Sequence, residues 1–384
     1  MSRMRVVVSI CVGLMLCAQA FAQAKPRARD LGVPFDGTPG PLNAITDVAG
    51  VEVGHTTLIS GEGEHAVRTG VTAVLPRGKT SSDPVFGGWF TLNGNGEMTG
   101  TTWVEESGFL EGPVMITNTH SVGVVRDAVI AWQHHRDGKT AQPWSLPVVA
   151  ETWDGYLNDI NGFHVHPEDA FNALNNAHAG AVEEGAVGGG TGMVCHGFKG
   201  GIGTASRKLD ERAGGYTVGV LVQCNYGLRD QLRIAGVPAG REINTSVPVA
   251  QVRENPDAER GSIIIVIATD APLLPHQLKR LTRRASLALG RMGSISGNGS
   301  GDIFIAFSTA NSSAAKPAGI ADLKMLPNER IGGVFEGTVQ ATEEAIVNAL
   351  VAAKTMTGVD GHTVVALPHE ELRQVLKKYG RLKE

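Results

Sequence analysis

The segment that decides the fold is Glu-Arg-Gly-Ser-Ile-Ile-Ile-Val-Ile-Ala-Thr-Asp, residues 259–270. Its polar, turn-like beginning changes at Ser262 into a run of five β-branched residues. A short apolar run bounded by turn residues predicts a strand that is buried on both faces. A serine at the mouth of such a strand is held rigidly, and Gly261 leaves the preceding peptide bond unshielded. The local sequence also permits a simpler interpretation, in which an ordinary loop meets a strand at a serine.

Cutting the bond between Gly261 and Ser262 would give Ser262 a free α-amino group. Such a group has a pKa of about 7.7–8.0 in reference peptides, so it could act as the base for the hydroxyl of its own residue. Residues 237–260, just before this bond, are polar and contain prolines without an apolar period. This composition predicts a loop in which proteolytic processing is tolerated.

The composition indicates a large globular protein. The chain has 384 residues, of which 42% are hydrophobic, and this is enough for a large core in one domain or two. The formal net charge is only −4, and no basic stripe is present. We therefore do not expect nucleic acid to be a partner.

The N-terminus has the pattern of a signal peptide. Arg3 and Arg5 precede a short apolar run, residues 6–16, and Ala-Phe-Ala follows at residues 20–22. A charged segment, an apolar segment and an A-x-A site predict export with cleavage after Ala22. The apolar run is too short to span a bilayer, although an uncleaved anchor is the alternative. We expect residues 1–22 to be removed as a signal peptide from a periplasmic or secreted protein. We expect the remaining residues, 23–384, to form one domain.

The remaining pattern alternates strands with helices. Buried strands without clean alternation are predicted at residues 113–119, 147–150, 216–223, 263–267 and 303–307. Apolar periodicity predicts helices at 122–136, 167–184, 276–292 and 339–356, with a short amphipathic helix at the C-terminus. Strands of this kind fit an α/β fold in which helices cover the sheets.

Two cysteines remain after signal removal, Cys195 and Cys224. In an oxidising compartment they could pair, but the sequence does not show whether their geometry permits it. Two buried free thiols are an equally open alternative.

Three common kinds of site are not indicated by the sequence. The 12 histidines form no H-E-x-x-H motif and no Cys/His ligand set, so we expect no metal and no cofactor. The glycine-rich segments 188–193 and 200–204 lack the Gly-Lys-Ser/Thr of a phosphate loop. Neither Ser294 nor Ser300 has the spacing of a G-x-S-x-G nucleophile elbow.

Polar residues stand at the ends of several predicted strands. The side-chain amide of Asn225 could donate a hydrogen bond to a tetrahedral oxyanion. Ser300 and Asp302 belong to the same strand–helix–strand unit as Ser262, and they could stabilise its α-ammonium group. Glu151 could pair with the ammonium group of a substrate. Because these residue types are ordinary in turns, the set alone does not identify a function.

Longer stretches resemble the DmpA-type aminopeptidases of peptidase family S58. This family covers L-aminopeptidase/D-Ala-esterase/amidases and β-peptidyl aminopeptidases. The similar stretches are Gly-Ser-Ile-Ile-Ile-Val-Ile-Ala-Thr-Asp-Ala-Pro-Leu-Leu-Pro (261–275), Leu-Asn-Gly-Asn-Gly-Glu-Met-Thr-Gly (92–100), Glu-Thr-Trp-Asp-Gly (151–155), Gly-Val-Leu-Val-Gln-Cys-Asn-Tyr-Gly (219–227) and Asn-Gly-Ser-Gly-Asp-Ile-Phe (298–304). They span nearly the whole mature chain in order, which makes the resemblance specific.

The resemblance implies a four-layer αββα sandwich, similar to N-terminal nucleophile hydrolases but with different connectivity. It implies that the precursor cuts itself between Gly261 and Ser262 by an N→O acyl shift. The resulting chains, 23–261 and 262–384, would stay together as one catalytic domain and assemble into a homo-oligomer of such heterodimers.

The resemblance also assigns roles to individual residues. Ser262 becomes the nucleophile, Ser300 and Asp302 assist it, and Asn225 lines the oxyanion hole. Glu151 matches the acid that holds the free amine of the substrate in β-peptidyl members. One departure is that those members carry Glu where this chain has the shorter Asp302.

An aromatic residue near Glu151 is functional in the D-Ala-releasing branch, and both Trp153 and Tyr156 are candidates for it. The chain is thus interpreted as a self-processing serine aminopeptidase acting on short peptides, amides or esters, without a membrane association after signal removal. One alternative is an acyl transferase or an oligoamide or lactam hydrolase of the same superfamily, in which Thr is more common at the cut. Another is a periplasmic binding protein, which would stay one chain.

Overall fold

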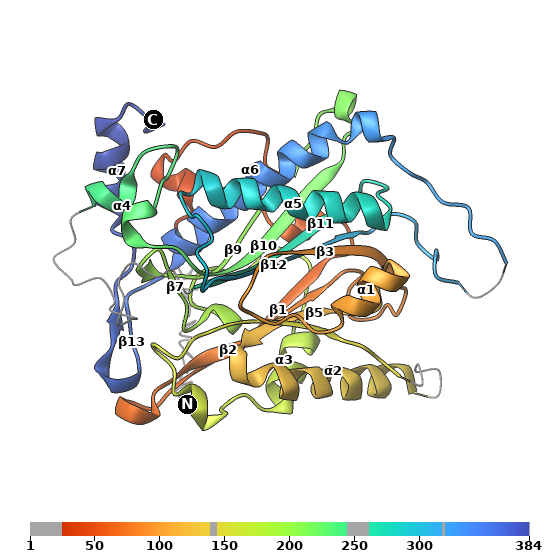
Figure 1. Cartoon of the computed structure of the whole chain (residues 1–384), viewed down its shortest axis with the longest axis horizontal. Helices are drawn as coiled ribbons and strands as arrows, with labels where there is room; N and C mark the ends of the chain where they lie inside the picture. Colours follow the sequence, from red (N-terminus) through yellow and green to blue (C-terminus); the bar gives the residue numbers. More distant parts are fainter. Residues whose placement is uncertain (1–24, 139–143, 244–260, 317–318, 384) are drawn as a thin grey trace, which may run out of the picture.

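The computed structural model describes residues 25–138, 144–243, 261–316 and 319–383. The predicted signal peptide and residues 244–260 of the predicted processing loop lie outside the described residues. Two sheets pack face to face between two layers of helices (Figure 1). Helices α5 (Pro275–Arg291) and α6 (Gly332–Ala352) cover one sheet, while α2 (Val122–Asp137) and α3 (Pro167–Asn175) cover the other. The predicted αββα sandwich is confirmed.

The larger sheet has six strands and contains the segment that decides the fold. Its order is β4 (Phe109–Leu110), β3 (Val85–Gly94), β12 (Gly301–Ser308), β11 (Ser262–Thr269), β10 (Thr217–Asn225) and β9 (Gly201–Lys208). Strands β11 and β12 are parallel and are joined through α5, whereas the other pairs are antiparallel. This β11–α5–β12 unit is the strand–helix–strand unit predicted from the sequence.

The smaller sheet has four strands, in the order β1 (Glu52–Ser60), β2 (Val67–Leu75), β5 (Val114–Asn118) and β6 (Val148–Thr152). Strands β5 and β6 are parallel and are joined through α2. The shorter elements are α1 (Thr101–Ser107), α4 (Ala239–Glu242), α7 (His369–Lys378), the hairpin β7 (Val194–Cys195) and β8 (Phe198–Lys199), and the hairpin β13 (Met356–Thr357) and β14 (Thr363–Val364). Among the described residues, no helix is long and apolar enough to cross a membrane.

Strand β11 shows why its sequence has no alternation of polar and apolar residues. Ile263, Ile265 and Ile267 belong to the core beneath α5 and α6. Ile264 and Val266 face the opposite way, into the core between the two sheets. Both faces are therefore removed from water, as the β-branched run predicts. A third core lies between the smaller sheet and helices α2 and α3.

Two predicted helices have different bounds in the structure. The helix predicted at 167–184 ends at Asn175, because the backbone of His178 pairs with Val53 and Gly180 has a φ of +120°. The helix predicted at 339–356 begins earlier, at Gly332, and ends at Ala352. Gly337 allows its early turns to approach Leu209 closely, since a Cβ there would lie 3.2 Å from the Leu209 side chain.

The predicted loop at 237–260 is also corrected at its start, where the four-residue helix α4 forms. Ile243, which follows this helix, is buried in the core together with Ala239. The apolar side chains here are too few to show a helical period in the sequence. The helices predicted at 122–136 and 276–292 agree with α2 and α5 to within a residue at each end.

Candidate active site

The candidate active site is built around the first residue of β11. Ser262 is paired with Asn225 at the end of β10 on one side and with Gly301 at the start of β12 on the other. Three of the motifs that resemble family S58 therefore meet at one end of the larger sheet. Ser262 and Asn225 are each 6% exposed, which leaves both side chains a narrow access to solvent.

The bond predicted to be cut is closely surrounded by backbone. The N–H of Gly301 donates a hydrogen bond to the carbonyl oxygen of Gly261 at 3.1 Å. A Cβ on Gly261 would lie 2.3 Å from the Asn225 carbonyl oxygen and 2.4 Å from the Cα of Tyr226, so only glycine fits there without a shift. A Cβ on Gly301 would lie 2.8 Å from the Ser262 hydroxyl oxygen. Gly301 thus leaves room for the Ser262 hydroxyl, and Gly261 permits close packing against the end of β10.

Ser300 and Asp302 flank Gly301 and are fully buried. The Ser300 hydroxyl donates a hydrogen bond to Oδ1 of Asp302 at 2.6 Å. The shorter side chain of Asp302 therefore still reaches Ser300. A carboxylate on β12 and a hydroxyl just before that strand thus flank Gly301, the residue that pairs with Ser262.

The turn before β12 is held by the segment 92–100. The side-chain amide of Asn93 donates to the Gly297 carbonyl at 2.6 Å, and that of Asn95 donates to the Gly299 carbonyl at 2.8 Å. The same segment then crosses to the smaller sheet, where the N–H of Thr99 donates to the Val149 carbonyl at 2.9 Å. The Leu-Asn-Gly-Asn-Gly motif thus fixes the Ser300 turn relative to β6.

Glu151 lies in β6 and is 3% exposed. Its Oε1 accepts the N–H of Glu97 at 3.0 Å, and its Oε2 accepts the hydroxyl of Thr119. Burial raises the pKa of this carboxyl, and the hydrogen bonds from Thr119 and Glu97 oppose that rise. A Cβ on Gly96 would lie 3.2 Å from Glu151 Oε1 and 3.3 Å from the Cα of Gly301. The Glu151 carboxylate therefore stands beside the mouth of β11.

The Asn225 amide is held between two backbone groups. Its Oδ1 accepts the N–H of Val194 at 2.7 Å, and its Nδ2 donates to the carbonyl of Trp153 at 2.9 Å. An amide nitrogen carries two donor hydrogens, so Nδ2 keeps a second one. Nearby, Nε2 of Gln223 donates to the Thr152 hydroxyl at 2.9 Å, which ties β10 to β6 across the two sheets.

The two candidate aromatic residues have different surroundings. Trp153 is 40% exposed, and its indole covers Gly155, where a Cβ would lie 2.7 Å from the ring. The backbone of Trp153 is joined to Asn225 by the hydrogen bond described above. The ring of Tyr156 instead stacks on His362, with ring centroids 4.4 Å apart and planes within 2°. The backbone of Trp153 is therefore tied to the strand mouth, and this contact does not involve its ring.

Several contributors to this arrangement were not predicted from the sequence. They are the N–H of Gly301, the hydroxyl of Thr119, the close approach at Gly96 and the N–H of Val194. Thr119 could have been predicted as a site residue from the sequence, because it stands at the end of the strand predicted at 113–119. Glu151 stands in the same way at the end of the strand predicted at 147–150. The two backbone donors carry no side-chain signal at all.

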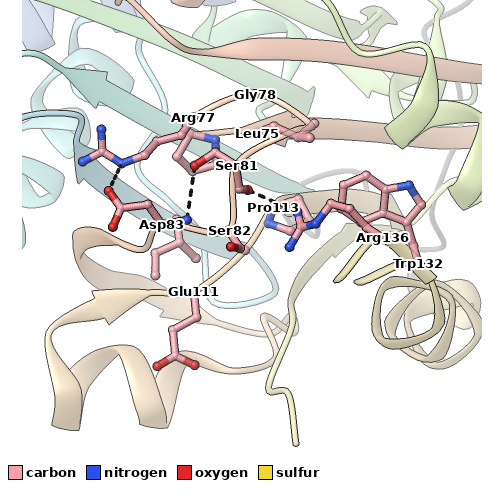
Figure 2. A pocket seen from close by; sticks show the side chains of 13 residues that line it. Leu75, Arg77, Gly78, Ser81, Ser82, Asp83, Glu111, Pro113, Trp132 and Arg136 are labelled. Carbon is pink, nitrogen blue, oxygen red and sulfur yellow. Dashed lines mark hydrogen bonds and ion pairs between the residues drawn. The ribbon is translucent and has the colours of Figure 1, made fainter. Parts of the chain in front are cut away.

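A separate pocket, lined by the end of β2, the loop that follows it, residues 110–113 and α2, contains none of these residues (Figure 2). Arg77 forms an ion pair with Asp83 at 3.2 Å, and Arg136 donates to the Ser81 carbonyl at 3.2 Å. Glu111, the remaining charged residue of the lining, accepts the indole N–H of Trp103 at 3.1 Å, so each charged side chain of this pocket has a partner. Within the described ranges, no group of three or more His, Cys, Asp or Glu residues is placed to hold a metal ion.

Comparisons with known proteins agree with this geometry. The family model for peptidase family S58 matches residues 43–364. The chain is 58% identical to β-peptidyl aminopeptidase BapA of Sphingosinicella microcystinivorans, with 97% of each chain covered. It is 50% identical to β-peptidyl aminopeptidase BapA of Sphingosinicella xenopeptidilytica, with 92% of each covered.

Solved structures show the same relationship. The L-aminopeptidase D-Ala-esterase/amidase of Ochrobactrum anthropi, a prototype serine aminopeptidase with a variant Ntn hydrolase fold, superposes with a TM-score of 0.87 at 50% identity, covering 93% of this chain and 100% of that one. A Burkholderia sp. β-aminopeptidase superposes with a TM-score of 0.86 at 48% identity, covering 92% and 99%. On the sequence match, the shared fold and the site at the mouth of β11, the chain belongs to peptidase family S58 and is a serine aminopeptidase.

Proposed function

We propose that this serine aminopeptidase is a self-processing enzyme that removes N-terminal β-amino acid residues from short peptides and amides. The observation that carries the proposal is the Gly261–Ser262 junction, where the Gly301 N–H donates to the Gly261 carbonyl beside the Ser262 hydroxyl. The preference for β-residues is supported by the two BapA relatives, which are β-peptidyl aminopeptidases. The carboxylate of Glu151 beside the same junction supports recognition of a free amine.

Self-cleavage follows from the groups around this junction. The Ser262 hydroxyl attacks the Gly261 carbonyl carbon, and the Gly301 N–H stabilises the negative charge that develops on the oxygen. The bond to the Ser262 nitrogen breaks, and the nitrogen takes up a proton to become an amine. Water then hydrolyses the resulting ester, leaving a carboxylate on Gly261 and an α-amino group on Ser262.

Turnover of a substrate reuses the same atoms. Glu151, as a carboxylate, pairs with the substrate ammonium and so selects an unblocked N-terminus. The Ser262 hydroxyl attacks the first carbonyl carbon and passes its proton to the α-amino group, and the leaving amine takes that proton as its bond to the carbonyl carbon breaks. Water then hydrolyses the ester on Ser262, which releases the N-terminal residue as a free acid and restores the hydroxyl. The second hydrogen of Asn225 Nδ2 stabilises the oxyanion. The Ser300–Asp302 pair stabilises the ammonium formed on Ser262.

The same proposal includes export and assembly. The pattern at residues 1–22 supports removal of a signal peptide and a periplasmic or secreted enzyme. The family resemblance supports a homo-oligomer of cleaved heterodimers. Cell fractionation and sizing of the purified enzyme would test both, since a cytosolic monomer would contradict them.

The substrate class is tested by assaying three p-nitroanilides side by side, carrying a β-homoamino acid, L-Ala or D-Ala. The proposal expects the highest kcat/KM with the β-homoamino acid. Faster release from L-Ala or D-Ala would instead favour the activity named for the Ochrobactrum relative. The variant Glu151→Gln is expected to raise KM most strongly for substrates with a free amine, because only those substrates bring an ammonium to this position.

A further inference from the structure

The orientation of the Asn225 amide depends on two backbone groups outside the larger sheet. The N–H of Val194 donates to Oδ1 of Asn225, while the Trp153 carbonyl accepts from Nδ2. A backbone N–H only donates and a backbone carbonyl only accepts, so the two contacts together exclude the flipped amide. If the Val194 contact were lost, only the Trp153 carbonyl would oppose rotation of the amide, and a rotated amide would present its oxygen to the site. That orientation would repel an oxyanion instead of stabilising it.

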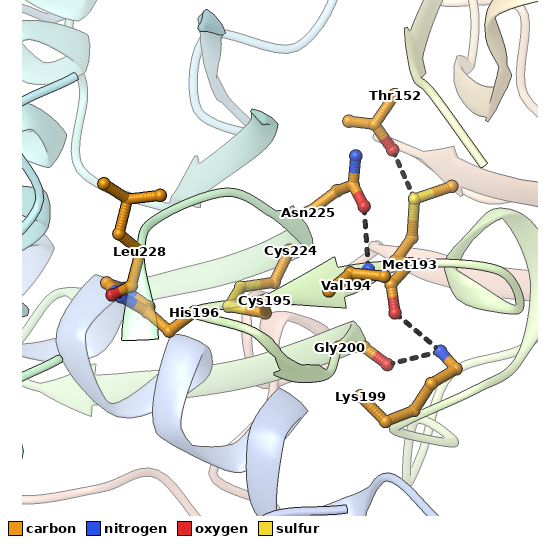
Figure 3. Close-up of a disulfide and its surroundings, with 10 residues drawn as sticks. All are labelled: Thr152, Met193, Val194, Cys195, His196, Lys199, Gly200, Cys224, Asn225 and Leu228. Carbon is orange, nitrogen blue, oxygen red and sulfur yellow. Dashed lines mark hydrogen bonds between the residues drawn. A yellow bond between two sulfur atoms is a disulfide. The ribbon is translucent and has the colours of Figure 1, made fainter. Parts of the chain in front are cut away.

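Val194 lies in a hairpin that is fastened beside the end of β10 (Figure 3). The turn at His196 and Gly197 has φ angles of +48° and +68°, the signs of a type I′ turn. The N–H of His196 donates to the Tyr226 carbonyl at 2.7 Å. A disulfide joins Cys195 to Cys224. It therefore connects the neighbour of Val194 to the neighbour of Asn225.

Lys199 holds the other side of the same peptide bond. Its ammonium is fully buried and donates to the carbonyls of Met193 and Gly200 at 2.9 Å each, with the Gly190 carbonyl at 3.5 Å. The Met193 carbonyl and the Val194 N–H belong to one peptide group. A cation on the carbonyl oxygen polarises that group and strengthens the hydrogen bond that its N–H donates. Figure 3 shows this path from Lys199 to Asn225.

A buried ammonium is expensive for the folded state unless its surroundings compensate it. Burial lowers the pKa of Lys199 to about 7, and the charge of Asp154 opposes that shift. An apolar side chain of similar length would avoid the desolvation of the ammonium. The direct contact with the Met193 carbonyl gives this lysine a role that a purely apolar residue could not fill.

We propose that Lys199 is a positioning residue for Asn225, acting through the Met193–Val194 peptide while the Cys195–Cys224 disulfide holds that peptide against β10. This inference rests on the proposed role of Asn225 in stabilising the oxyanion. Lys199 itself touches neither Ser262 nor the substrate in this account. Its effect is on the transition state alone, because the Asn225 contact forms as negative charge develops.

The first test compares Lys199→Met with Lys79→Met in the full-length, processed enzyme. Lys79 also donates to two backbone carbonyls, those of Asn175 and Ala177, but these lie at the end of α3. With activity expressed per titrated Ser262 nucleophile, Lys199→Met is expected to lower kcat about 10- to 100-fold with little change in KM. Lys79→Met is expected to keep the wild-type kcat. Equal kcat values for both variants and wild type would overturn the proposal.

A double-mutant cycle separates positioning from general destabilisation. Asn225→Ala alone is expected to lower kcat about 10²- to 10³-fold. If Lys199 acts through Asn225, adding Lys199→Met to Asn225→Ala lowers kcat by less than about twofold further. A full multiplication of the two single effects would show that Lys199 acts elsewhere, and it would overturn the proposal.

A second variant covers the case in which Lys199→Met does not fold. Replacing both Cys195 and Cys224 with Ala removes the covalent link and leaves Lys199 in place. This variant is expected to lower kcat, and the loss should again disappear in the Asn225→Ala background; a wild-type kcat would count against the proposal. Failure of the proposed function can be distinguished from failure of the Lys199 proposal. In that case Asn225→Ala would keep the wild-type kcat, or the wild-type chain would show no aminopeptidase activity.

Discussion

The N–H of Gly301 donates a 3.1 Å hydrogen bond to the carbonyl oxygen of Gly261. This contact links the start of β12 to the residue just before β11, so it is a product of the parallel pairing between those strands. It places a donor on the carbonyl of the one peptide bond that self-processing would cut. A donor that is already in place needs no reorganisation when negative charge develops there. This donor supports the proposed attack by Ser262 on the uncut chain.

Gly261→Ala should slow self-cleavage although it leaves the Ser262 hydroxyl intact. The added Cβ would lie 2.3 Å from the Asn225 carbonyl oxygen and 2.4 Å from the Tyr226 Cα, so the junction must shift relative to β10 and to the Gly301 N–H. A displacement of about 1 Å costs on the order of 100-fold in rate. The measurement is the fraction of cut chain with time after synthesis or refolding.

The matched control for this variant is Gly290→Ala in α5, where a Cβ would meet nothing within 4 Å. It should process at the wild-type rate and gain a little stability, about 1 kcal/mol at most, because alanine favours a helix over glycine. Wild-type processing by Gly261→Ala would show that the close packing around the junction is unimportant.

Thr119→Val should shift the acid limb of the pH profile upward. Burial raises the pKa of Glu151, and the Thr119 hydroxyl holds it down by donating to the ionised form. Removing that donor raises the pKa further, so the carboxylate that binds the substrate ammonium is lost at a higher pH. Protonation of the Ser262 α-amino group also lowers kcat/KM in acid, so the ratio of kcat/KM for substrates with and without a free amine is measured against pH, because that ratio isolates the contribution of Glu151.

Thr338→Val is the control for Thr119→Val. Thr338 is also buried, and its hydroxyl donates to the Val334 carbonyl within α6. Its pH profile should match that of the wild type. An acid limb that stays in place for Thr119→Val, or that moves downward, would argue against Glu151 as the ammonium-binding group.

Glu344→Gln should destabilise the fold by about 3–5 kcal/mol, the usual cost of breaking a buried ion pair. Glu344 is fully buried and accepts hydrogen bonds from Arg29 at 2.7 Å and from Asn43 at 2.6 Å, and it pairs with Arg207 at 2.7 Å. Burial by itself would raise the pKa of Glu344, but the Arg29 hydrogen bond and the Arg207 charge hold it below its usual value.

The direction of this pKa shift fixes how the stabilisation depends on pH. Because the pKa of Glu344 is lower in the folded state than in the unfolded state, the ionised carboxylate stabilises the fold at pH values above its unfolded-state pKa of about 4.3. This stabilisation is lost as the pH falls through the folded-state pKa. The stability difference between wild type and Glu344→Gln should therefore shrink in acid. Chemical denaturation at pH 7 and at pH 4 measures it, with Glu336→Gln, at an exposed position of the same helix, as the control. A constant difference would contradict this assignment.

The strand at Ser262 could be predicted from the sequence because its run of β-branched residues is local and complete. The same is true of α2 and α5, whose apolar periods are clear. The helix predicted at 167–184 failed beyond Asn175, because the backbone pairing of His178 with Val53 is a long-range contact. No local pattern contains such information.

The side chains of the candidate site could be found from the sequence, but their supports could not. Glu151 and Asn225 stand out as polar residues at strand ends. The N–H groups of Gly301 and Val194 act through the backbone, so their roles depend only on how strands pair. The cysteine pairing, left open by the sequence, required the hairpin that brings the Cα atoms of Cys195 and Cys224 to 5.7 Å.

The central claim is that Ser262 becomes the nucleophile by being freed from Gly261. Denaturing electrophoresis of the purified protein, with N-terminal sequencing of the smaller band, tests it most directly. We expect two chains, the smaller beginning Ser-Ile-Ile at Ser262, and one uncut chain without aminopeptidase activity for Ser262→Ala. A wild-type protein that hydrolyses its substrate while remaining a single uncut chain would contradict it.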